Sequence, residues 1–335
     1  MTPMQDVVIV ASGETVGGPV VFEGFDRAEL AELGRNWRLD LTVAAVASTA
    51  CYRIVREPWS AAAWMTRSGA PVQADGLVRV ACGHEDALAG AGGVAWIAPG
   101  ARVARVAIDP ENDDPLGFNE LIGAALTHAM ALAGRVPLHG MAAEIEGVGV
   151  LVLGESMAGK STLALALLHA GGRVVSDDFL LVGCEPGQTD VHAMRRDLYV
   201  REGSFALIPE ELRGRFSTEG AGSDRLVLRR EDAPEQFAAV VTPEVVWFLD
   251  GSRGSSSFEA REISQAAALA LMMAATSPLF VTERYHEERI RTLPALAAIV
   301  ESARCFSVCL GADLLRSPGI VVRELLARTL RATAP

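Results

Sequence analysis

The sequence predicts an α/β protein with two regions, a β-rich N-terminal region over residues 1–110 and a mixed α/β region over residues 111–335. Residues 1–110 alternate short apolar or β-branched runs with Gly, Pro and Asp, which is the pattern of strands separated by turns. After a polar connector that ends at Pro115, runs with helical spacing alternate with strand-like runs. Half of the residues are apolar and 21% are charged, a composition that suits a large buried core and excludes a disordered chain.

Six runs in the N-terminal region predict strands: VVIVASG, PVVFEGF, LDLTVAAVA, GLVRVACG, GVAWIAPG and ARVARVAID. None of them carries recognisable chemistry. By elimination, we assign this region to substrate contacts or to a surface between copies of the chain, so a homo-oligomer stays open.

The mixed region has the element order of an α/β domain, and no internal repeat is visible. Expected strands lie at 141–145, 148–153, 173–176, 199–208, 239–250 and 305–310. Expected helices lie at 118–134, 161–170, 263–275, 293–302 and 320–332.

Charge and cysteine content exclude several classes of protein. Forty-two acidic against 30 basic residues give a net charge of −12, which argues against a nucleic-acid partner bound through phosphate neutralisation. The five cysteines are scattered and include no C-x-x-C pair, so neither a disulfide framework nor a zinc site is indicated. We expect a cytoplasmic protein that neither enters nor spans a membrane, since no signal-like segment begins the chain and the apolar run from Ala266 is short and interrupted.

The lysine count points to one position. Of the 30 basic residues, 29 are arginine and only Lys160 is lysine. A general arginine bias has a plain cause in codon usage, but a site that needs a compact ammonium would explain the exception.

Lys160 lies in a segment that fits G-x-x-x-x-G-K-[ST], with an apolar strand before it and a helix-forming run after it. In such a segment the backbone N–H groups and the helix N-terminus converge on phosphate oxygens, the lysine reaches the β- and γ-phosphates, and the serine hydroxyl can bind Mg²⁺. ATP and Mg²⁺ are therefore the expected ligands. The expected nucleotide-binding residues are Gly154, Glu155, Ser156, Met157, Ala158, Gly159, Lys160, Ser161 and Thr162.

Two sets of carboxylates compete for the role of metal-associated acid. Asp177 and Asp178 follow the first strand after the loop's helix, whereas Asp250 ends the apolar run VVWFLD, the usual shape of a Walker B strand. We favour the pair, because two carboxylates can divide metal binding and proton acceptance. The alternatives are a solvated turn for the pair and a strand-end turn for Asp250. His139, in the segment PLHG, is either a catalytic residue or a structural histidine.

The stretch LHGMAAEIEGVGVLVLGESMAGKSTLALALLHAGGRVVSDDFLLV resembles the catalytic domain of HPr kinase/phosphorylase and its relatives, with the same order of His-Gly, strand, phosphate loop, helix and Asp-Asp. The resemblance implies a P-loop kinase domain over 111–335. It implies that Asp177 is the base that activates a serine hydroxyl, that Asp178 supports the metal, and that His139 assists catalysis. It covers about 135–182 well and does not cover 1–110.

Departures from the family pattern bear on the substrate. Met157 stands where the HPr-specific enzymes usually have glycine, Thr162 stands where they have glutamate, and their L-E-I-R-G signature is only echoed by residues 199–203. The chain is more similar to the related kinases of peptide-modification pathways, including those that phosphorylate lasso-peptide precursors.

Residues 195–230 hold eight arginines against six acidic residues. They predict a locally positive segment for phosphates or an acidic peptide, with Arg195, Arg196, Arg201 and Arg225 as candidate substrate contacts. The Gly/Ser-rich stretch within 213–223 predicts a mobile lid. The alternative is an ordinary exposed loop.

The sequence thus predicts an ATP- and Mg²⁺-dependent kinase that phosphorylates a hydroxyl, most plausibly a serine of a peptide or small protein. Two alternatives remain. One is an NTP-binding regulatory ATPase in which Asp250 is the Walker B acid, and the other is a kinase of a small-molecule hydroxyl, since acceptor specificity lies in loops without a readable code.

Overall fold

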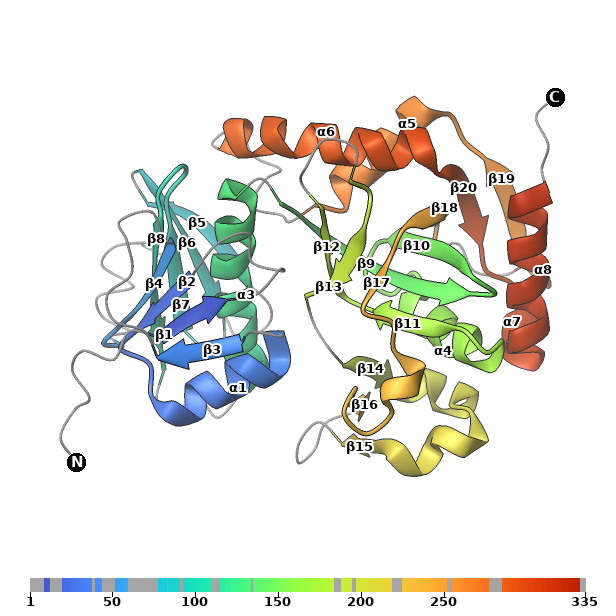
Figure 1. The fold of residues 1–335 in the computed structure, drawn as a ribbon, viewed down its shortest axis with the longest axis horizontal. Coiled ribbons are helices and arrows are strands. Elements are labelled where there is room, and N and C mark those ends of the chain that lie inside the picture. The colour runs from blue at the N-terminus through green and yellow to red at the C-terminus, as the bar shows by residue number, and fades with distance from the viewer. Residues whose placement is uncertain are drawn as a thin grey trace. The chain divides into compact units, whose positions relative to one another are not determined.

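The computed structural model of the chain divides into two compact units, one spanning Met1–Arg135 with Pro278–Arg291 and the other Val136–Ser277 with Thr292–Pro335. It describes residues 9–12, 20–37, 40–43, 52–59, 78–82, 84–90, 93–109, 115–133, 135–183, 188–194, 197–218, 225–251, 255–276 and 285–331. Both helices and sheets are present, so the α/β fold class is confirmed (Figure 1).

The first unit is built on an eight-stranded sheet in the order β3-β1-β2-β4-β8-β7-β6-β5. Its strands are β1 (Ile9–Ser12), β2 (Val20–Glu23), β3 (Asp40–Val43), β4 (Tyr52–Glu57), β5 (Val78–Cys82), β6 (Glu85–Gly90), β7 (Gly93–Ile97) and β8 (Val103–Ile108). β4 lies parallel to β2 and β8, and the other pairs are antiparallel. The strand-rich character expected for this region is therefore present.

Two helices belong to this unit, α1 (Arg27–Trp37) and α3 (Pro115–Leu132). The sequence pattern did not indicate α1. Its signal was local, because Asp26 accepts hydrogen bonds from the N–H of Ala28 and Glu29, and Glu29 accepts one back from the N–H of Asp26. This is the reciprocal capping of a helix start. α3 packs on β6, β7 and β8 of this unit, although the expected boundary near residue 110 precedes it.

The second unit is built on a nine-stranded sheet in the order β17-β13-β12-β9-β10-β18-β20-β19, with β11 paired to β9. Its strands are β9 (Val136–Ile145), β10 (Val148–Gly154), β11 (Arg173–Ser176), β12 (Phe179–Val182), β13 (Val191–Ala193), β17 (Val240–Val241), β18 (Pro243–Leu249), β19 (Glu259–Glu262) and β20 (Arg304–Cys309). β10, β18 and β20 are parallel neighbours. Their carboxyl ends therefore meet at one edge of the sheet, where ligands of α/β sheets commonly bind.

Helices cover both faces of this sheet (Figure 1). On β10, Val150 and Val152 belong to the core with α4 (Lys160–His169) and α8 (Pro318–Arg331), whereas Leu151 and Leu153 belong to the core with α5 (Gln265–Ala274) and α6 (His286–Ser302). A strand that is buried on both faces needs a continuous apolar run rather than alternation, as β10 and β18 have.

Shorter elements complete this unit. They are η1 (Glu202–Leu207), η2 (Glu210–Arg215), η3 (Pro234–Gln236), α7 (Asp313–Arg316) and a small antiparallel sheet in the order β14-β16-β15, made of β14 (Leu198–Arg201), β16 (Arg225–Leu228) and β15 (Phe216–Thr218). Among the helices of the described segments, none has both the length and the apolar character needed to cross a bilayer.

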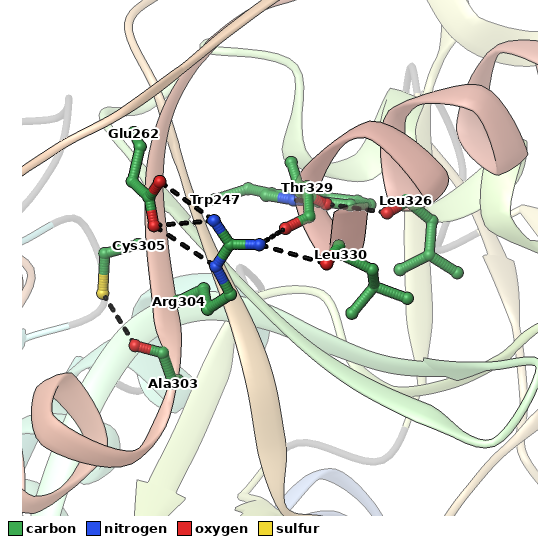
Figure 2. A network of polar contacts seen from close by, with 8 residues as sticks. All are labelled: Trp247, Glu262, Ala303, Arg304, Cys305, Leu326, Thr329 and Leu330. Carbon is green, nitrogen blue, oxygen red and sulfur yellow. Dashed lines mark hydrogen bonds and ion pairs between the residues drawn. The ribbon is translucent and has the colours of Figure 1, made fainter. Parts of the chain in front are cut away.

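A polar network ties α8 to the sheet (Figure 2). Trp247 on β18 donates its indole N–H to the Thr329 hydroxyl at 3.3 Å, and both side chains are buried. Arg304 on β20 donates to the carbonyls of Thr329 and Leu330 at 2.8 and 3.1 Å and also pairs with Glu262. An arginine at the end of a helix thus satisfies carbonyls that have no partner within the helix.

Candidate functional site

The phosphate loop connects β10 to α4 at the edge where the parallel strands end. Met157 and Gly159 adopt left-handed conformations, with φ of 68° and 105°. A Cβ added at Gly154 would meet Leu249 of β18 at 3.0 Å. Glycine is therefore required at 154 by the approach of the neighbouring strand and favoured at 159 by the backbone conformation.

Lys160 is buried, with 7% of its surface exposed, and its ammonium folds back onto the loop. Nζ donates to the carbonyl oxygens of Gly154 at 2.7 Å and Glu155 at 2.9 Å. Burial lowers the pKa of Lys160, and the charges of Asp178 and Asp177 oppose that shift. The single lysine of the chain is thus enclosed by the backbone of the predicted phosphate site.

Asp177 lies beside Ser161, the first helical residue after the lysine. The Ser161 hydroxyl donates to Asp177 Oδ2 at 3.1 Å, and the backbone N–H of Tyr199 donates to the same oxygen at 3.3 Å. Asp177 is buried, with 4% of its surface exposed. The carboxylate is therefore held against the hydroxyl that the loop pattern assigns to a metal ion.

Asp178 has a different partner, because it lies 3.0 Å from His139, measured from Oδ1 to Nδ1. The Asp178 and His139 side chains are partly exposed, at 26% and 39%. Phe179 contacts the imidazole edge-to-face, with ring centroids 6.1 Å apart. A carboxylate on Nδ1 orients an imidazole and leaves Nε2 for a further contact.

The strand pairing explains why these two aspartates point to the site. β11 pairs with residues 142–144 of β9 and β12 pairs with residues 136–139, so the ladder along β9 is interrupted at Asp177 and Asp178. Gly140 N–H donates to the Asp178 carbonyl inside this interruption. Interruptions of a ladder re-aim side chains and are common beside active sites.

Comparison with known proteins adds a family to this geometry. The model of the HPr Serine kinase C-terminal domain matches residues 130–197, which contain His139, the phosphate loop and both aspartates. This segment is HPr kinase-like. HPr kinase/phosphorylase of Xanthomonas campestris pv. campestris (strain B100) is 46% identical over 79 residues, which is 22% of this chain and 25% of that protein. The enzyme of Xanthomonas oryzae pv. oryzae (strain PXO99A) is 51% identical over 65 residues, or 19% and 21% of the two chains.

The matched stretch thus spans about a quarter of the length of these curated relatives. Among solved structures, the Hpr(Ser) kinase/phosphatase of Coxiella burnetii is similar with a TM-score of 0.30 and 13% identity, covering 58% of this chain and 98% of that one.

A second segment, which the sequence analysis placed only by its echo of a family signature, contacts the HPr kinase-like segment. The Thr162 hydroxyl lies 2.9 Å from that of Ser204 in η1, and Arg201 Nη1 lies 3.8 Å from Met157 Sδ at the tip of the loop. With the Tyr199 N–H on Asp177, three contacts join residues 199–204 to the phosphate loop and the aspartates. No sequence signal could have found these contacts, since they depend on a fold between segments about forty residues apart.

Asp250 follows β18, which lies beside β10 in parallel, and its exposed side chain is at the same edge of the sheet. Ser161 nevertheless donates to Asp177. This contact favours the aspartate pair for the role in which Asp250 was the alternative.

The candidate arginines are only partly described. Arg195, Arg196 and residues 219–224 of the expected lid lie outside the described residues. Arg201 is exposed and Arg225 is half-buried. Their roles, like those of the other site residues, stay predictions.

The residues present fit a magnesium ion. Within the described residues, no three His, Cys, Asp or Glu side chains gather as a ready-made metal centre. Mg²⁺ commonly takes one or two protein oxygens and completes its shell with water and phosphate oxygens. Ser161 and Asp177, in mutual contact beside the loop, offer such a pair.

Proposed function

We propose that the chain is an ATP-dependent kinase that transfers the γ-phosphoryl group to a serine hydroxyl of a peptide or small protein, with Mg²⁺ as cofactor. The observation that supports this most strongly is the convergence of Lys160, Ser161, Asp177 and the Asp178–His139 pair around one phosphate loop within an HPr kinase-like segment. The departures at Met157 and Thr162 favour a peptide-modification kinase, such as one for lasso-peptide precursors, over an HPr-specific enzyme.

Each part of the site has a role in the proposed reaction. The loop N–H groups and Lys160 bind the β- and γ-phosphates, and bound Mg²⁺ would neutralise charge on them. The acceptor oxygen forms a bond to the γ-phosphorus as the bond to the ADP oxygen breaks. The hydroxyl proton passes to a protein group and then to water.

The contacts favour a division of roles between the aspartates that is the reverse of the one implied by the family resemblance. Asp177 is buried, accepts two hydrogen bonds on Oδ2 and lies against Ser161, which suits a metal ligand. Asp178 is more exposed and is paired with His139, which suits acceptance of the hydroxyl proton. We therefore propose Asp177 for the metal and the Asp178–His139 pair for the proton.

Labelled ATP tests the function itself. With γ-phosphate-labelled ATP and a set of serine peptides, we expect label on peptide that depends on Lys160 and Mg²⁺. Release of free phosphate alone, with every hydroxyl acceptor unlabelled, would instead support the regulatory ATPase, and label on a small-molecule hydroxyl but on no peptide would support the third alternative.

Two matched amide variants test the division of roles. Asp178→Asn should lower the transfer rate by about 10²–10⁴-fold at an unchanged Mg²⁺ requirement, because the amide cannot accept a proton. Asp177→Asn should raise the Mg²⁺ concentration that gives half-maximal activity. If Asp177→Asn abolishes transfer while nucleotide and Mg²⁺ binding stay normal, Asp177 is the base, as the resemblance implies.

A further inference from the structure

Two arginines face each other across the small sheet of the second unit. β14 and β16 are antiparallel, and their register places Arg201 directly opposite Arg225 at the end of the ladder. Opposite residues of an antiparallel pair project from the same face with Cβ atoms about 4.5–5.5 Å apart, and like charges in that position repel each other. A protein gains nothing in stability from this arrangement unless an anion lies between the two guanidinium groups.

The neighbouring arginines of this small sheet are arranged differently. Arg229 lies 3.7 Å from Asp197, and Arg215 is paired with Glu235. In the part of the chain that the structure describes, the side-chain contact of Arg201 is to the neutral thioether of Met157. Arg201 is thus a solvent-exposed cation that contacts no carboxylate of the described residues.

The location of the pair connects it to the phosphate loop. Met157, the contact of Arg201, is the exposed tip of the loop, with 63% of its surface accessible. The strand that carries Arg201 also supplies the Tyr199 N–H to Asp177, and η1, which follows directly, supplies Ser204 to Thr162. These contacts on both sides of Arg201 fix the position of the strand end beside the site.

We propose that Arg201 and Arg225 form an oxyanion-binding site at the rim of the phosphate loop, which takes a carboxylate or phosphate group. The proposal rests on the proposed kinase function. Its ligand is either an acidic side chain of the acceptor peptide next to the serine or the terminal phosphate of the nucleotide, because both present the planar or tripodal oxygens that a guanidinium binds through two N–H groups. In a chain of net charge −12, such a pair would attract an acidic acceptor to the one edge of the sheet where the reaction takes place.

A peptide-binding measurement tests the acceptor as the source of the anion. Two fluorescent serine peptides of equal length, one with Asp and one with Ala on both sides of the serine, are titrated by anisotropy with MgADP present. We expect tighter binding of the acidic peptide, and we expect Arg201→Ala and Arg225→Ala each to reduce that preference by about tenfold. Arg201→Lys should keep part of the preference, because the charge remains while the paired N–H geometry is lost.

A nucleotide-binding measurement tests the other source. If the terminal phosphate is the ligand, Arg201→Ala should weaken ATP binding by about tenfold and leave ADP binding unchanged. Arg261→Ala on β19, an exposed arginine outside the proposed site, is the matched control and should change neither measurement.

Thermal unfolding separates a binding site from a structural role. Removing one of two opposed arginines should leave the melting temperature unchanged or raise it, whereas an arginine that supports the small sheet would lower it on removal. The proposal is overturned if the acidic-peptide preference and the ATP-over-ADP preference both persist in the Arg201→Ala, Arg225→Ala double variant. Both measurements are of binding, so they give a result even if no hydroxyl is phosphorylated and the kinase function itself fails.

Discussion

Lys160 combines two properties that make it a direct probe of the site. It is the sole lysine of the chain, and its ammonium donates to two loop carbonyls in a buried position. Because burial lowers its pKa, a larger fraction of Lys160 than of an ordinary lysine is neutral at a given pH below its usual titration range, and only the neutral amine reacts with an acylating reagent.

We expect MgATP to block acylation of Lys160. The β- and γ-phosphates would occupy the volume beside Nζ and favour the charged form, whereas the N-terminal amine should react equally with and without nucleotide and serves as the internal control. Mass spectrometry of the peptide that contains Lys160 measures both. Equal labelling of Lys160 in the two conditions would contradict the phosphate site.

Met157 tests the backbone of the loop. Its φ of 68° costs a non-glycine residue about 1–2 kcal/mol, and a β-branched side chain tolerates that conformation least. Met157→Gly should therefore keep the stability and nucleotide affinity of the native protein, while Met157→Val should lower stability by about 1–2 kcal/mol and weaken nucleotide binding. Chemical denaturation and nucleotide titration of the two variants make the comparison, and equal behaviour of Gly and Val would show that the loop does not need this conformation.

At the level of residues, the sequence predicts what is local and misses what depends on register. The spacing from Gly154 to Ser161 is enough to expect a loop between a strand and a helix, because the chemistry of that turn resides in consecutive residues. The partners of Asp177 and Asp178 could not be predicted, since they depend on where β11 and β12 pair along β9. The opposition of Arg201 and Arg225 likewise arises only when β14 and β16 align.

At the level of elements, burial on both faces explains which predictions succeeded. The expected strand at 148–153 and helix at 161–170 correspond to β10 (Val148–Gly154) and α4 (Lys160–His169), whose apolar runs are unambiguous. The expected strand-like run at 199–208 is instead the short strand β14 followed by the 3₁₀-helix η1. Its apolar residues pack from a turn rather than from a strand, and the polar residues among them stay exposed.

The attachment of α8 to the sheet gives an element-scale prediction. Thr329→Val keeps the shape of the side chain but removes the acceptor of the Trp247 indole N–H, which is fully buried. The variant should lose about 1–3 kcal/mol of unfolding free energy, the cost of leaving a buried donor without a partner. Thr218→Val on β15, where the side chain is exposed, is the matched control and should change stability little. Equal denaturation midpoints for the two variants would show that the network in Figure 2 does not hold α8.

At the level of the whole molecule, the chain does not divide at a single point. The first unit takes residues 278–291 from the second half of the sequence, and Tyr285 is fully buried there, in edge-to-face contact with His128 of α3. His128 Nδ1 in turn lies 2.8 Å from the Tyr52 hydroxyl of β4. A boundary near residue 110 was the natural expectation from the polar connector, but composition cannot show that a segment far along the chain returns to an earlier unit.

Two N-terminal truncations test where the second unit begins. A fragment of residues 111–335 keeps α3 without β6, β7 and β8, so the side chains of Leu121, Ile122 and Leu126, which are fully buried in the chain, would face water. A fragment of residues 136–335 lacks that helix. Because a contiguous apolar helix face exposed to water promotes association, we expect the shorter fragment to elute as a single species with low binding of a hydrophobic dye, and the longer one to aggregate. Nucleotide affinity, measured on the soluble fraction of each, controls for loss of the phosphate loop. A well-behaved 111–335 fragment beside an aggregating 136–335 fragment would place α3 with the phosphate-binding unit and restore the boundary that the sequence predicts.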